Sequence, residues 1–230
     1  MKCAIFCTVA ALCAAPLCAP LCAAPAPSTA PAANDPGSAA TARLAVEEGV
    51  RRSLAILRDP NLSRAEKSQR IGQIADDAID FETVSRLALG PPWKQLTDAQ
   101  KEEFVREFRK HVVAICAHAP DGYRDQQVEV AGDKQEERGD WTVHTRILGK
   151  QDDGTPKETG QVDFRLRRRD GRWRIIDLNL EGISIAANLR AQFQAIISNG
   201  GIDRMFQVLR QRDEAHENAD RAADKATTGK

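Results

Sequence analysis

The chain has 230 residues, with 33 Lys and Arg against 33 Asp and Glu, and 42% of its residues are hydrophobic. This balance gives no bulk electrostatic attraction to nucleic acid or to an acidic membrane. Five of the six cysteines lie in the first 22 residues and only Cys116 follows, which excludes a disulfide framework for the rest of the chain. The length suits one domain whose apolar core alone holds it together.

The N-terminal segment has the pattern of a secretory signal peptide. Lys2 precedes an apolar stretch, Ala4 to Ala15, that is too short to span a bilayer. The small residues around Pro31 predict cleavage after Ala32, and the cysteines of this segment leave a lipoprotein signal as the alternative. We therefore expect a signal peptide over residues 1–32, a disordered leader over 33–40, a single domain over 41–211 and a disordered polar tail over 212–230.

Two helices should open the domain. Apolar residues recur at helical spacing from Val46 to Leu57, and Pro60 should end the first helix because proline disfavours helical dihedrals in the residue before it. Ser63 followed by Glu66 is the capping-box signature of a second helix.

Two further helices complete the first half of the domain. Asp80 opens a short helix that Gly90 should end. Thr97 with Gln100 is another capping box, and it starts a long helix that should end before Pro120.

The apolar pattern then switches to a period of two, which is typical of strands. The dipeptides Asp153-Gly154 and Asp170-Gly171 favour hairpin turns, so the last three strands should form an antiparallel meander. The last strand is apolar on both faces and should be covered on both sides. The predicted strands lie near residues 128–130, 141–147, 162–166 and 173–180.

A long helix should follow the last strand after a tight corner at Gly182. Ser184 is placed to cap this helix, Gly200 and Gly201 should break it, and a short helix should follow over residues 202–209. Helices before and after consecutive strands predict an α+β fold, with a consecutive antiparallel four-stranded sheet packed with about six helices.

The histidines and Cys116 give no pattern of a metal or nucleophilic site. His111, His118, His144 and His216 are too scattered to form a ligand set. We expect His111 at the edge of the core and His144 facing solvent. Cys116 falls on the apolar stripe of its helix, which favours a small buried hydrophobe over a nucleophile.

Three carboxylates lie near apolar sequence, and two interpretations of them stay open. Asp80, Asp177 or Glu181 could transfer protons if burial raised its pKa. Alternatively, Asp80 caps its short helix, and Asp177 and Glu181 hydrogen-bond around the corner at Gly182.

A group of arginines alternates with apolar residues around the last hairpin. A solvated outer face is the favoured interpretation, and a docking or headgroup surface is the alternative because arginine binds phosphate and carboxylate with a forked geometry. The group consists of Arg165, Arg167, Arg168, Arg169, Arg172 and Arg174.

Two blocks of this sequence resemble the MlaC family, also called toluene-tolerance auxiliary proteins, and the resemblance runs over about residues 42–209. The departures are Leu189 for the family's usual tyrosine, Val84 for its methionine, and Pro91-Pro92 in place of a basic-aromatic pair. The first block consists of Asp80-Phe81, Arg86, Leu89-Gly90, Trp93, Thr97, Gln100 and Phe104. The second consists of Trp173, Ile175, Asp177, Glu181-Gly182-Ile183-Ser184, Asn188, Arg190, Gln192-Phe193 and Gly201-Ile202.

This resemblance implies a periplasmic phospholipid carrier of an ABC-type lipid transport system, with no catalytic residue, metal or cofactor. Phospholipid would be its cargo, held in a deep apolar cavity with the headgroup in water. Its partners would be an inner-membrane ABC lipid transporter complex and an outer-membrane lipoprotein-porin complex, which together maintain outer-membrane lipid asymmetry. A small secreted α+β-cone enzyme with a buried carboxylate and a pocketless periplasmic adaptor are the alternatives.

The predicted lining of that cavity combines apolar residues of the long helices and the strands, and the sequence leaves open which strand face points inward. The set is Phe104, Phe108, Val112, Val143, Ile147, Val162, Phe164, Ile176, Leu178, Leu180, Ile183, Leu189 and Phe193.

Overall fold

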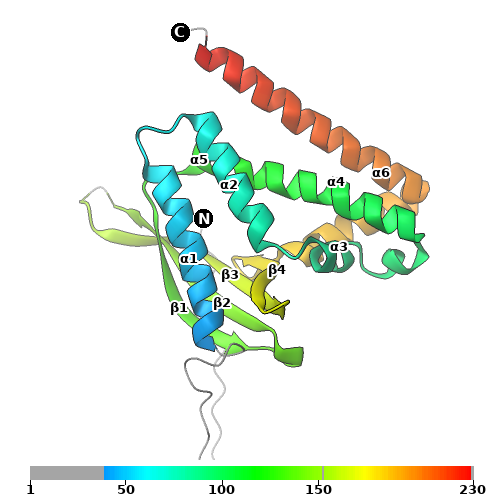
Figure 1. Ribbon diagram of the computed structural model, residues 1–230, viewed down its shortest axis with the longest axis horizontal. Helices are drawn as coiled ribbons and strands as arrows, with labels where there is room; N and C mark the ends of the chain where they lie inside the picture. The colour runs from blue at the N-terminus through cyan, green and yellow to red at the C-terminus, as the bar shows by residue number, and fades with distance from the viewer. Residues whose placement is uncertain (1–38, 152, 229–230) are drawn as a thin grey trace, which may run out of the picture. The chain divides into compact units, whose positions relative to one another are not determined.

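The structure is a computed structural model that describes residues 39–151 and 153–228. Within these residues the strands are consecutive and antiparallel, and helices precede and follow them, which confirms the predicted α+β class (Figure 1). The predicted signal peptide and most of the predicted leader lie outside the described residues. The last two leader residues, Ala39 and Ala40, are already helical.

The helices begin where side chains can accept their free N–H groups. Ser63 and Thr97 each form the predicted capping box, with Glu66 and Gln100 respectively. The carboxylate of Asp80 accepts from the backbone N–H of Thr83 at 3.0 Å. The helices before the sheet are α1 (Ala39–Arg58), α2 (Arg64–Ala78), α3 (Phe81–Leu89), the 3₁₀ turn η1 (Pro91–Gln95), α4 (Asp98–Ala117) and α5 (Ala119–Gly122).

The sheet has the order β1-β2-β3-β4-β5, so each strand pairs with its neighbours in sequence. The four predicted strands are present, and the two-residue strand β5, which was not predicted, extends the sheet. The elements of this half are β1 (Gln127–Gln135), η2 (Glu137–Gly139), β2 (Trp141–Lys150), β3 (Pro156–Arg169), β4 (Arg172–Leu180) and β5 (Ile183–Ser184).

A bulge in β4 changes the faces predicted for its side chains. Phe164 of β3 pairs with Leu178, but Leu166 pairs with Ile175, so β4 has one extra residue between these pairs. Ile175 and Leu178 therefore lie on one face, whereas strict alternation predicted opposite faces. We expected β4 to be covered on both faces. This holds for Ile176, which is fully buried, but not for Leu180 at the end of the strand, which is exposed.

Helix α6 (Ile185–Thr228) follows β5 directly. The hydroxyl of Ser184 accepts from the backbone N–H of Ala187 at 3.0 Å, as predicted for a cap. The predicted break is also present, because Gly201 has a φ of 74° and separates two helical arms. The second arm continues to Thr228, so most of the predicted disordered tail is helical in the structure. Its Ala, Arg, Glu and Lys residues have high intrinsic helix propensity.

The helices form one of two buried apolar clusters, which we call the helical core. Three of its aromatic rings pack tightly: Phe104 lies 5.5 Å from Phe108 and 5.4 Å from Phe193 between ring centroids. Phe193 precedes Gly201 and Phe206 follows it, so both arms of α6 contribute. The helical core consists of Ala88, Leu89, Leu96, Phe104, Phe108, Phe193, Met205, Phe206 and Leu209.

Over residues 39–151 and 153–228, every helix is too short or too polar to cross a bilayer. Over the same residues, His, Cys, Asp and Glu side chains do not gather in groups of three that could hold a metal ion.

Candidate functional site

The strand register places one row of side chains across the whole sheet. Val130 pairs with Thr145, Thr145 with Val162, Val162 with Leu180, and Leu180 with Ile183. Directly paired residues lie on the same face, and so do residues two apart along a strand. Apart from Thr145 the row is hydrocarbon. We call this side of the sheet the apolar face.

Helix α1 covers one end of the apolar face. Its Ala42 and Val46 form the second buried cluster with Trp141, Val143 and Leu166 of the sheet. An ion pair between Arg43 and Asp133 also joins α1 to β1. This end of the face is therefore closed.

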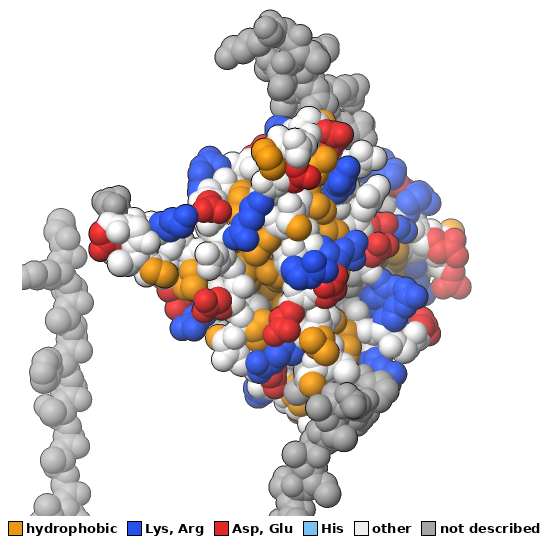
Figure 2. Space-filling model, turned by 60° about the vertical axis from the view of Figure 1, so that its left-hand side comes forward, with side chains coloured by type: hydrophobic (Ala, Val, Ile, Leu, Met, Phe, Trp, Pro, Cys, Tyr) orange, Lys and Arg blue, Asp and Glu red, His pale blue; other side chains and the backbone are white. Residues whose placement is uncertain are grey.

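The other end of the apolar face remains partly open. Ile147, Val162 and Leu178 are half-buried. Leu180 is 42% exposed and its partner Ile183 is 59% exposed. Hydrophobic side chains also reach the surface as a band between charged groups on the face drawn in Figure 2. Apolar area left uncovered in this way is typical of a binding surface.

The predicted lining residues separate into two groups, with Ile176 apart from both. Phe104, Phe108 and Phe193 are at most 1% exposed and belong to the helical core, and Val112 and Leu189 pack against it. Ile176 is fully buried at the bulge. The strand residues that the register brings together on the apolar face are Val143, Ile147, Val162, Phe164, Leu178, Leu180 and Ile183.

Sequence reasoning missed several members of the apolar face. Val128, Val130, Leu166 and Ile175 share it by pairing or by alternation with the predicted residues. The period-two pattern of β1 was the available signal. For Ile175 no sequence signal existed, because the bulge decides its face.

Four hollows of the described surface lie away from the open end of the apolar face. One of about 530 Å³ lies between α2 and α4, and another of about 500 Å³ lies beside the turn between β3 and β4. Charged and polar side chains contribute much of their lining. The deep apolar cavity over the sheet stays a prediction.

The corner between β4 and α6 is fixed by one carboxylate. Asp177 accepts from the backbone N–H of Ala186 at 3.0 Å and from the hydroxyl of Ser184 at 2.6 Å. Glu181 accepts from the backbone N–H of Gln161 at 2.8 Å. Both acids thus have the structural role that one of the two interpretations assigned to them.

Asp80 also has a structural role. Burial opposes its ionisation, but hydrogen bonds from Thr83 and Arg169 outweigh that effect and hold the pKa of Asp80 below its usual value. A proton-transfer residue needs a shift in the other direction, so the structure contradicts the elevated pKa that the enzyme alternative requires of Asp80.

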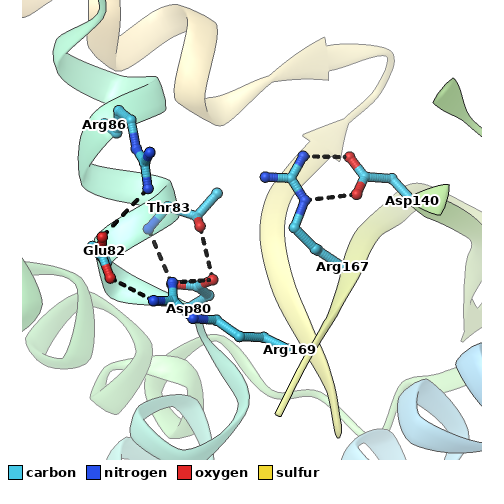
Figure 3. Close-up of polar contacts among 7 residues, drawn as sticks. All are labelled: Asp80, Glu82, Thr83, Arg86, Asp140, Arg167 and Arg169. Atoms are coloured by element: carbon cyan, nitrogen blue, oxygen red, sulfur yellow. Dashed lines mark hydrogen bonds and ion pairs between the residues drawn. The ribbon is translucent and has the colours of Figure 1, made fainter. Parts of the chain in front are cut away.

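Half of the predicted arginine group is paired with acids, and Figure 3 shows the pairs of Arg167 and Arg169. Arg167 binds both oxygens of Asp140, at 2.7 and 2.8 Å, and Arg165 adds a bond of 3.0 Å. Arg169 bridges Asp80 and Glu82. Asp140 is fully buried and was missed by sequence reasoning, since a single acid before a strand gives no signal of burial.

His111 and His144 each lie beside an acid, and Cys116 is shielded from solvent. His111 is buried, as expected, and lies 3.1 Å from Asp213 of α6. His144 is half-buried 3.0 Å from Asp163, so the expectation that it faces solvent is wrong in part. Burial raises the pKa of the Cys116 thiol, which disfavours a nucleophilic role.

These observations define a class: an α+β binding protein with a buried helical core and a sheet face that leaves apolar surface uncovered. The chain belongs to the MlaC family, because the family model described as "MlaC protein" matches residues 47–211, more than half of its length. The predicted family resemblance is thereby confirmed.

This chain is similar to proteins that are already known, two of which are described here. The intermembrane phospholipid transport system binding protein MlaC of Haemophilus influenzae is 22% identical over 134 residues, which cover 58% of this chain and 62% of that protein. The chain thus matches less than two thirds of this relative's length. A phospholipid-binding protein from Ralstonia solanacearum, solved in complex with a phospholipid, superposes with a TM-score of 0.63 and 25% identity, covering 76% of this chain and 98% of that one.

Proposed function

We propose that this protein is a periplasmic phospholipid carrier whose apolar face holds the acyl chains. The observation that carries the proposal is the row from Val130 to Ile183, which is hydrocarbon over four of its five residues and partly open at Leu180 and Ile183. Family membership and the phospholipid in the similar Ralstonia protein support the same conclusion.

The cost of exposing acyl chains to water explains why such a carrier retains its cargo. Each buried CH₂ contributes about 0.8 kcal/mol, so two chains of about 16 carbons would represent roughly 25 kcal/mol. Non-covalent affinity saturates near 18 to 21 kcal/mol. Release into water is therefore negligible, and lipid should leave only when apolar surface exchanges for apolar surface in a docked partner.

The partners of the proposed carrier are an inner-membrane ABC lipid transporter complex and an outer-membrane lipoprotein-porin complex. Exchange between them would maintain outer-membrane lipid asymmetry. The signal-peptide pattern, with cleavage proposed after Ala32, supports export to the periplasm. The structural roles of Asp80, Asp177 and Glu181 favour a carrier over a proton-transfer enzyme.

Native mass spectrometry of protein purified from the periplasm without detergent tests the proposal. We expect a stoichiometric mass increase that solvent extraction resolves into phospholipid, and we expect it to survive dilution. A mass without cargo, unchanged after incubation with phospholipid vesicles, would instead support a pocketless adaptor. Turnover of a small substrate that is lost in Asp177→Asn would support the enzyme.

A further inference from the structure

Four arginines from three elements converge on a hollow of about 270 Å³. Arg86 comes from α3, Arg138 from η2, and Arg165 and Arg167 from β3. Thr83, Leu87 and Glu137 complete the lining. Figure 3 shows α3, with Arg86 and Thr83, opposite the guanidinium of Arg167. We call this site the arginine hollow.

A buried acid fixes two of these guanidiniums but does not use all of their N–H donors. Asp140 is fully buried and binds Nε and Nη2 of Arg167 together with Nη2 of Arg165. Nε of Arg165 is buried without any acceptor. Each guanidinium has five N–H donors, so Asp140 uses only part of their capacity. Asp140 therefore holds the pair in place and leaves part of its donor capacity unused.

The charges around the arginine hollow do not balance. Counting Arg169, five guanidiniums line or adjoin it, against the four carboxylates of Asp80, Glu82, Glu137 and Asp140. Glu82 is nearby, but Arg169 holds it at 2.7 Å and Arg86 reaches it only at 3.4 Å. Arg138 is exposed in the η2 loop, where its φ of 62° fixes it in the left-handed region. Among the described residues around the hollow, guanidiniums therefore outnumber carboxylates by one.

The arginine hollow is separate from the apolar face. Arg165 and Arg167 alternate with Phe164 and Leu166 along β3, so they point to the opposite side of the sheet. Its volume also lies below the roughly 300 to 1,000 Å³ of pockets that enclose drug-sized ligands. The hollow has room for one small anionic group and not for acyl chains.

We propose that the arginine hollow binds a phosphate group, supplied either by free phosphate or by a phospholipid headgroup at a membrane surface. The phosphate oxygens accept from several guanidinium donors at once, which is the geometry that arginine forks match. This site is additional to the proposed lipid cargo, because its residues lie off the apolar face.

A charge-matched pair of double variants tests the site. Arg86→Gln with Arg138→Asn removes two of its cations while keeping the buried Arg–Asp140 pairs, and asparagine tolerates the left-handed backbone at 138. The control, Arg52→Gln with Arg168→Gln, changes the net charge equally at two exposed positions outside the hollow. Circular dichroism and urea unfolding should show that both variants fold.

The readout is the ¹⁵N-resolved Nε–H resonances of the arginine side chains during titration at constant ionic strength, which keeps screening equal. Inorganic phosphate and glycerol phosphate are the soluble probes. We expect the Arg165 and Arg167 signals to shift in wild type and in the control, with affinity at least about tenfold weaker in the site variant because two charge-assisted contacts are lost.

Vesicle sedimentation with phosphatidylglycerol identifies the source of the phosphate. If the site variant loses vesicle binding and the control keeps it, the site binds headgroups. If the soluble phosphates bind but the two variants bind vesicles equally, the site binds free phosphate. If neither the soluble probes nor the vesicles distinguish the site variant from the control, the proposal is wrong. Wild-type protein that carries no lipid would contradict only the proposed carrier function and not the phosphate site.

Discussion

The helical core and the apolar face are built from the same kinds of residues but differ in what covers them. In the helical core, Phe104 and Phe108 are fully buried and stack at 5.5 Å. On the apolar face, Leu180 and Ile183 pair with each other and remain 42% and 59% exposed. Hydrophobicity alone therefore does not tell a core from a binding surface. What differs is whether another element completes the packing.

Truncation in the helical core should have the largest effect on stability. Phe104→Ala leaves a cavity among rings that cannot collapse freely, and we expect the free energy of unfolding to fall by about 3 to 5 kcal/mol. Ile183→Ala, at the exposed end of the apolar face, should change it by only about 0.5 kcal/mol. Urea unfolding followed by circular dichroism measures both. Equal losses would remove the distinction between the two regions.

A charge on the apolar face should strongly reduce the amount of bound lipid, although truncation there hardly changes stability. Leu180→Asp puts a carboxylate among the proposed acyl contacts, where bound lipid would cover it and the short side chain could not reach past the lipid to water. We expect at least about a tenfold loss of bound lipid, since an unpaired buried charge costs several kcal/mol, with folding retained. Leu44→Asp, at an exposed site on α1, is the matched control. Native mass spectrometry gives the occupancy, and full occupancy in Leu180→Asp would exclude this part of the face.

The smallest expected effect is electrostatic and lies outside both regions. Hydrogen bonds from Arg64 of α2 lower the pKa of Asp121 in α5 to about 2. Because the folded pKa lies below the unfolded one, the stabilisation is present above about pH 4 and lost as the pH falls toward 2. The pair is partly exposed, so its contribution should be about 1 kcal/mol or less.

Asp121→Asn should remove this part of the acid sensitivity. Urea midpoints at about pH 5 and about pH 2 measure it, and the wild type should lose more stability between them than the variant. An identical pH dependence in both proteins would show that the Arg64–Asp121 pair contributes nothing. Either result gives the stability contribution of one surface ion pair, which can be compared with the loss in Phe104→Ala.

Local signals predicted the element boundaries well. Ser63, Asp80 and Thr97 cap helices because their side-chain oxygens lie within reach of the first free N–H groups, a property of three or four consecutive residues. Gly201 breaks α6 because it alone adopts a positive φ there. Such features need no knowledge of tertiary structure.

The candidate site was less predictable because it depends on register and coverage. The bulge at Ile176 moves Ile175 and Leu178 to one face, and alternation in the sequence cannot show an extra residue. Phe104 and Phe193 were predicted as lining, yet both lie inside the helical core. Asp140 gives no sign in the sequence that it will be buried between two arginines.

The break at Gly201 gives the two arms of α6 different mechanical roles. Its first arm is tied to the sheet at Asp177, whereas its second arm runs along α4 through Arg210 with Glu103 at 2.8 Å and the packing of Phe206 on Phe104. A pulling force applied at the C-terminal end would load the second arm first and peel it from α4. The strands would bear that force only after the aromatic contacts had separated.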